Sequence, residues 1–274
     1  MTDARRWDGA LEAAGVGLVV VVLHLLFRLS GSFLVGALND DGVYAVLGKA
    51  IAGGEGYRSV HLVGEPVHTR YPPGLPLLLA LPWALGGTLS AVRATIGVVN
   101  VAATGVAAAL VWSVGRRRLG VSPWPLAVLA VGPLVLDPTI QYFNITLTEP
   151  YLVLGWVAGL ALAYPLFPRA TPEDVAPPTP TPTPTPTPPQ LWRAAGVGLI
   201  LAATTLFRTA GIALLPAMLV ALLLHRRWKE CGVCAVAMLI PLVAWEGLLA
   251  TWIGRGPVST NPDDLGYWRW LGGG

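Results

Sequence analysis

The amino-acid sequence predicts an all-α, polytopic membrane protein with about seven transmembrane helices. Of its 274 residues 54% are hydrophobic and only 12% are charged, whereas soluble domains carry about 25% charged residues. Its apolar segments have the length of membrane spans, and clusters of arginine separate several of them. Because a span uses about 20 residues, the chain holds these helices and leaves no room for a soluble second domain.

Charge and cysteine content exclude two other function classes. The net charge of +3 is dispersed over a hydrophobic chain, which is typical of basic flanks on the cytoplasmic side of spans and not of a nucleic-acid binder. Cys231 and Cys234 form a lone C-x-x-C pair at the start of an apolar helix. Without further ligands, we interpret them as packing residues and not as a redox or metal site.

The basic clusters give each span a direction. Residues 13–38 follow Arg5 and Arg6 and form an uncleaved first span with a cytoplasmic amino end. Residues 94–115 end at the cytoplasmic triplet 116–118, residues 121–136 return outward, and residues 151–167 return inward. This topology places Asp40, Asp41 and Glu149 at the non-cytoplasmic face.

Residues 194–224 are too long for one span, and basic residues flank them on both sides. A hairpin that turns at Phe207-Arg208-Thr209 keeps both basic flanks in the cytoplasm and places Arg208 outside. Residues 231–253 then form the last span. Glu246 within it is expected to pair inside the helix bundle. His24 in the first span is expected to pack inside the bundle or to reach toward the interface, with a direct contact to substrate as the alternative.

Two short helices are expected in the first outer loop. Apolar residues after Asp41 follow an amphipathic helical period that Gly53-Gly54 ends. Residues 75–85 are apolar but too short to span, which indicates a second interfacial helix.

The chain divides into three parts by composition. Residues 1–168 form an amino-terminal membrane module, residues 169–192 a cytoplasmic linker, and residues 193–274 the carboxyl-terminal spans with an outer tail. Thr-Pro repeats in the linker cannot build a packed core and predict an extended spacer.

The outer face collects polar residues from separate parts of the chain. Charge distribution alone leaves open whether they form a site or are ordinary loop charges. They are Asp40, Asp41, Glu65, His68, Arg70, Tyr71, Asp137, Glu149, Arg208 and Arg255.

The order of several short motifs along the chain resembles that of the glycosyltransferase C superfamily. The resemblance covers about residues 15–255, and the likeness is to bacterial enzymes similar to protein O-mannosyltransferases and aminoarabinose transferases. It rests on Asp40-Asp41 with Tyr44 and Ala45, on Gly53-Gly54-Glu55-Gly56-Tyr57, on Tyr71-Pro72-Pro73-Gly74-Leu75-Pro76, on Thr148-Glu149-Pro150 and on Phe207-Arg208-Thr209-Ala210-Gly211.

The resemblance implies transfer of a sugar from a polyprenyl-phosphate donor to a lipid or glycan acceptor, usually with inversion. It implies that Asp41, or Asp40, is the general base, unless both only cap the helix that follows. Arg208 and Arg70 would stabilise the leaving phosphate or act as interfacial anchors. Glu149 would orient the acceptor or bind a divalent ion, and the sequence leaves metal dependence open.

Tyr57, Tyr71 and His68 are candidate substrate contacts, with structural roles as their alternative. Family members usually continue through further spans, so we expect a fragment, a degenerate member or one half of a two-chain enzyme with a complementary membrane chain. A protein that binds or translocates a lipid-linked sugar without catalysis is the alternative function. The expected location is the bacterial inner membrane.

Overall fold

The computed structural model describes residues 3–30, 39–135, 148–167, 188–254 and 256–257. These residues form helices and connecting loops, and their one β-pairing is an isolated bridge between Arg58 and Val67. The helices are α1 (Asp3–Ser30), α2 (Asn39–Ala52), α3 (Gly74–Ala84), α4 (Leu89–Arg117), α5 (Pro123–Val135), α7 (Glu149–Ala163), η1 (Tyr164–Leu166), α8 (Pro188–Phe207), η3 (Thr209–Ala213), α9 (Leu214–Leu224) and α10 (Trp228–Ile253).

Five helical segments within these residues are long and apolar enough to cross a membrane. They are Gly9–Leu26, Leu89–Arg117, Glu149–Leu166, Gln190–Phe207 and Trp228–Ile253. The all-α membrane fold is therefore confirmed. The other two predicted spans correspond to shorter apolar helices, α5 and the segment Thr209–Leu224.

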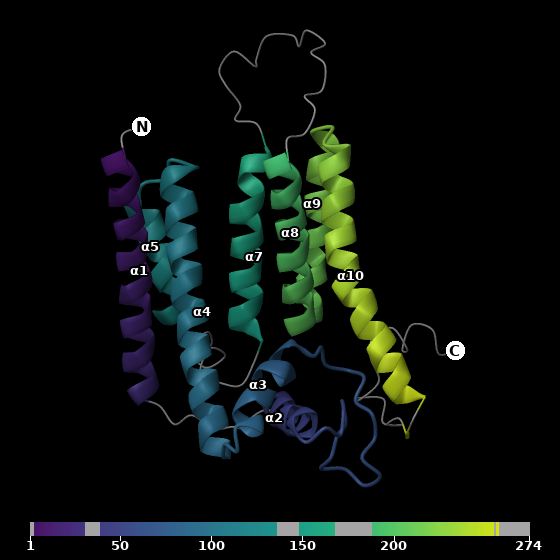
Figure 1. Cartoon of the computed structure of the whole chain (residues 1–274). Coiled ribbons are helices and arrows are strands. Elements are labelled where there is room, and N and C mark those ends of the chain that lie inside the picture. The colour runs from purple at the N-terminus through teal and green to yellow at the C-terminus, as the bar shows by residue number, and fades with distance from the viewer. Residues whose placement is uncertain (1–2, 31–38, 136–147, 168–187, 255, 258–274) are drawn as a thin grey trace.

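The apolar helices stand side by side, and α2 and α3 lie across one end of the bundle (Figure 1). The start of α1, the end of α4 and the start of α10 lie at the opposite end (Figure 1). The predicted short helices of the first loop are thus present, and Gly54 ends α2 with a φ of +77°. That left-handed conformation is one that glycine adopts without strain.

Glycine allows the long helices to approach closely. A Cβ atom on Gly17 of α1 would lie 2.9 Å from the carbonyl oxygen of Gly105 in α4. A Cβ atom on Gly198 of α8 would collide with the carbonyl oxygen of Cys234 in α10. In lipid no hydrophobic effect drives helices together. Small residues at such crossings let the backbones approach, and close packing then stabilises the helix pair.

Two hydrophobic clusters hold the helices together. One lies within the bundle and joins α7, α8, α9 and α10 around the buried residues Leu201, Leu222, Cys234 and Met238, among others. The other joins α2, α3, α4 and α7 around Tyr44, Leu75, Ile96 and Tyr151, among others. Cys234 is buried and Cys231 partly buried, both as free thiols, in agreement with the prediction that they are packing residues.

Two sequence-based expectations need correction. Glu246 lies exposed on α10 and was expected to be paired inside the bundle. Val243 and Ala250, about one turn away on either side, are exposed as well, so position 246 lies on an outward face of α10 that sequence alone does not define. Residues 188–192 of the predicted linker belong to α8, because proline is tolerated in the first turn of a helix. The Thr-Pro repeats before Pro188, together with Asp137 and Arg255, lie outside the described residues.

Candidate functional site

Two motif segments that are far apart in the sequence touch where the first loop meets the bundle. Gly74, at the start of α3, lies against the end of α8. A Cβ atom there would lie 2.7 Å from both the Leu206 carbonyl oxygen and the Phe207 ring. The Phe207 ring in turn stacks on Tyr151 of α7, with centroids 4.7 Å apart and planes 26° apart. We call this contact region, formed by Gly74, Thr148, Glu149, Tyr151, Phe207 and Arg208, the motif junction.

Arg208 occupies the break between α8 and η3, as the predicted hairpin turn requires. Its backbone is extended, with φ −150° and ψ 126°. Its amide donates to the Thr204 carbonyl over 2.9 Å, and its own carbonyl accepts from the Gly211 amide over 2.8 Å. A Cβ atom on Gly211 would lie 2.7 Å from the Thr205 nitrogen. The F-R-x-x-G motif is therefore a tight turn that holds the arginine in one place.

The Arg208 guanidinium binds the T-E-P segment. Its Nη1 donates to Glu149 Oε1 over 2.5 Å and to Thr148 Oγ1 over 3.1 Å. The two charged side chains are 39% and 26% exposed, so this ion pair is open to solvent on one side and contributes little stability. The second carboxylate oxygen, Glu149 Oε2, is buried and accepts no hydrogen bond from the described residues.

Asp40 and Asp41 lie in the first turn of α2, as predicted. Their side chains are outside the described part of the structure. Tyr44, one turn further along α2, is buried, and its ring lies 5.0 Å from that of Tyr71. Tyr44 shares its hydrophobic cluster with Tyr151 and Phe207. The helix that carries the two aspartates therefore packs beside the motif junction.

Tyr57 and His68 use their polar atoms within the loop itself. The Tyr57 hydroxyl donates to the carbonyl oxygens of Tyr71 and Pro72 over 3.0 and 3.1 Å. Its burial, and secondarily Tyr44, raise the pKa of Tyr57 well above its usual value. His68 Nε2 accepts from the Tyr71 amide over 3.2 Å, so a neutral ring carries its proton on Nδ1 and donates it to Ser59. Both buried side chains brace the loop.

Arg70 and Tyr71 follow His68 in this loop, and both side chains are half-buried. The Tyr71 ring stacks on His68 with centroids 5.1 Å apart, and the Arg70 guanidinium carbon lies 5.2 Å from the Tyr71 ring centre. Both residues are partly exposed. Among the residues predicted from sequence, Arg208 and Glu149 are in direct contact. Arg70, Tyr71 and His68 contact one another within the first loop.

Tyr151 is a residue of the motif junction that sequence reasoning missed. It is 8% exposed, and its hydroxyl has no hydrogen-bond partner among the described residues. Its position directly after T-E-P was the signal available, because an aromatic residue with a polar tip suits a membrane interface.

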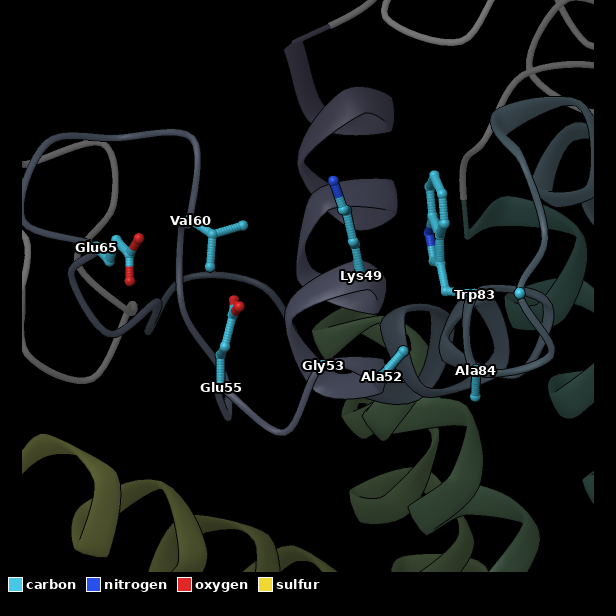
Figure 2. Close-up of a pocket in the computed structure, with 9 residues that line it drawn as sticks. Lys49, Ala52, Gly53, Glu55, Val60, Glu65, Trp83 and Ala84 are labelled. Atoms are coloured by element: carbon cyan, nitrogen blue, oxygen red, sulfur yellow. The ribbon is translucent and has the colours of Figure 1, made fainter.

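A cavity of about 510 Å³ opens at the carboxyl ends of α2 and α3 (Figure 2). It shares no residue with the motif junction. Its lining consists of Lys49, Ala52, Gly53, Glu55, Val60, Glu65, Trp83, Ala84 and Gly86. Three of these were named from sequence: Glu65 as an outer-face residue, and Gly53 and Glu55 in the Gly53-Gly54-Glu55-Gly56-Tyr57 segment. We call this cavity the α2–α3 pocket.

Within the described residues, no three histidine, cysteine, aspartate or glutamate side chains gather as a metal site would require. A scan against models of protein families, a search of curated proteins and a search of solved structures give no match to this chain.

Proposed function

We propose that this membrane protein transfers a sugar from a polyprenyl-phosphate donor to a lipid or glycan acceptor at the membrane face where α2 and α3 lie. The observation that carries the proposal is the motif junction. Segments around Gly74, Glu149 and Arg208 resemble glycosyltransferase C motifs one by one, and they meet at one end of an apolar bundle. A lipid-linked donor held in the membrane presents its phosphate at that level.

The reaction needs a proton acceptor and a group that stabilises the leaving phosphate. The acceptor hydroxyl attacks the anomeric carbon, its proton passes to a carboxylate, and the bond between that carbon and the phosphate oxygen breaks. The polyprenyl phosphate leaves with the bonding electrons. We assign the proton to Asp41, or to Asp40, in the first turn of α2. We assign the leaving phosphate to Arg208, with Arg70 as a second cation.

The ion pair of Arg208 and Glu149 supports this division of roles. Glu149 and Thr148 hold one guanidinium nitrogen, while 39% of the arginine side chain stays exposed. A cation held this way is oriented before the donor arrives, so little reorganisation is needed as charge develops on the phosphate.

The second candidate is a protein that binds or translocates a lipid-linked sugar without catalysis. The partly exposed arginines Arg70 and Arg208 favour it, because they suffice to bind a phosphate without any base. The two functions differ in their need for Asp40 and Asp41.

The deciding experiment compares donor binding and turnover in the same preparations. The full chain, alone or with a complementary membrane chain, is first assayed for transfer from a polyprenyl-phosphate sugar. In an active preparation, Asp41→Asn should lower turnover about a hundredfold to ten-thousandfold with donor binding nearly unchanged. Asp40→Asn tests the alternative base. Arg208→Gln should instead weaken donor binding. Normal turnover in both aspartate variants and in the double variant would end the catalytic proposal and leave the binding function.

We further propose that the start of α1 and the basic triplet 116–118 face the cytoplasm and that the membrane is the bacterial inner membrane. The arginines at the end of α4 and at the start of α10 lie at the end of the bundle opposite α2 and α3, which supports this orientation (Figure 1).

A further inference from the structure

The α2–α3 pocket has features of a binding site that is separate from the motif junction. Lys49 lies nine residues after Asp40 on α2, which is about 14 Å along the helix axis at 1.5 Å per residue. The cavity volume of about 510 Å³ falls within the usual range for small-molecule sites. Figure 2 shows Glu55 and Glu65 on the loop side, Trp83 on the α3 side and Lys49 between them.

The electrostatics of the pocket favour a cation. Glu55 and Glu65 contribute two carboxylates, and Lys49 contributes the one ammonium group of the lining. The carboxyl ends of two helices also line it, because α2 ends at Ala52 and α3 ends at Ala84. Backbone amides cap the last carbonyl groups of both helices, so the side chains decide the sign, and two carboxylates against one ammonium group leave an excess of one negative charge. A phosphate or carboxylate ligand would meet this excess with only Lys49 in its favour.

Trp83 presents a fixed aromatic ring to the same cavity. Its indole Nε1 donates to the Ala45 carbonyl oxygen over 3.1 Å, which anchors the ring between α3 and α2. The Lys49 ammonium nitrogen lies 5.8 Å from the ring centre. That is the distance at which a cation is attracted to the face of an indole. Lys49 therefore occupies the position that the ammonium group of a ligand would take.

Glu65 is held on the rim in a conformation that few side chains adopt. Its φ is +45°, in the left-handed region. The Arg58 guanidinium donates to the Glu65 carbonyl oxygen over 3.0 Å, and the Glu65 amide donates to Leu62 over 3.1 Å. The loop thus keeps this carboxylate beside the cavity.

We propose that the α2–α3 pocket binds an organic ammonium group, with Trp83 and the two glutamates as its contacts and Lys49 as an internal competitor for the same position. The ligand is a small soluble amine or the ammonium-bearing headgroup of a membrane lipid. This binding does not require the proposed sugar transfer, and none of the pocket residues belongs to the motif junction.

The test uses the full chain in nanodiscs of phosphatidylglycerol, which carries no amine. Fluorotryptophan is incorporated, and the fluorine NMR signal that disappears in Trp83→Phe is assigned to Trp83. Ethanolamine and choline are then titrated, with ethanol as the neutral control of similar size. We expect a saturable shift of the Trp83 signal with both amines and none with ethanol. The double variant Glu55→Gln, Glu65→Gln should weaken amine binding about tenfold, since two exposed charge interactions are lost.

Lys49→Met should change the amine affinity in the direction opposite to the glutamate variants, so it distinguishes a cation site from an anion site. If Lys49 competes with the ligand, its removal should tighten amine binding severalfold. If Lys49 instead recruits an anion, its removal should abolish a response to inorganic phosphate, and that result would overturn the proposal. Equal shifts with ethanol and ethanolamine would overturn it as well. Nanodiscs with phosphatidylethanolamine identify the source, because a lipid headgroup in the pocket would shift the Trp83 signal before any soluble amine is added.

Discussion

A substitution at Gly198 tests how closely the backbones of α8 and α10 approach each other. Gly198 of α8 faces Cys234, and a Cβ atom there would collide with the Cys234 carbonyl oxygen and lie 2.9 Å from the Ala237 side chain. Backbone cannot move aside as a flexible side chain can, so Gly198→Ala should carry an overpacking cost of about 1–3 kcal/mol. Gly232, on α10, has no atom within 4 Å of its added Cβ, so Gly232→Ala is the matched control.

Comparison of the two variants isolates the collision. Alanine is favoured over glycine inside a helix by about 1 kcal/mol at either position, and this gain cancels in the difference. Gly198→Ala should therefore unfold about 2–12 °C below Gly232→Ala, from the size dependence of melting temperatures. A thiol-reactive fluorophore reports unfolding in detergent, because the chain has two cysteines and Cys234 is buried. Tryptophan fluorescence checks that labelling itself causes no artefact. Equal midpoints, or a higher midpoint for Gly198→Ala, would show that α8 and α10 do not approach this closely.

Three further outcomes are expected. Tyr57→Phe leaves two carbonyl acceptors without their donor and should lower stability by about 1–3 kcal/mol, whereas Tyr164→Phe, whose hydroxyl bond is exposed, should cost less than half as much in the same melting assay. Thiol labelling of intact cells should modify a cysteine at position 149 but one at 183 only after permeabilisation, and the reverse pattern would invert the topology. Replacement of residues 177–189 by a Gly-Ser segment of equal reach should leave membrane insertion unchanged in a fractionation assay, and loss of insertion would indicate specific recognition of the Thr-Pro repeats.

Some features of the candidate site followed from sequence because their causes are local. The length of residues 194–224 and the basic residues at both of its ends predicted the turn at Arg208, and the structure places Arg208 in extended backbone there. The short helix after Asp41 followed from an amphipathic period and the Gly53-Gly54 stop. The order of motifs suggested which loops are functional, but no distance between them could be derived, because contacts across about 60 residues depend on how helices pack.

The sequence by itself determined that this is an all-α membrane protein, because hydropathy over about 20 residues decides whether a segment can lie in lipid. It also predicted the break at Arg208 between α8 and η3. Only the tertiary structure decided which side chains meet. It turned Tyr57 and His68 into internal braces of the loop, joined Arg208 to Glu149, brought Tyr151 to Phe207 and left Glu246 exposed. The physical reason is that the identity of a residue fixes its hydrogen-bonding capacity, whereas its partners depend on the rotation and crossing of whole helices.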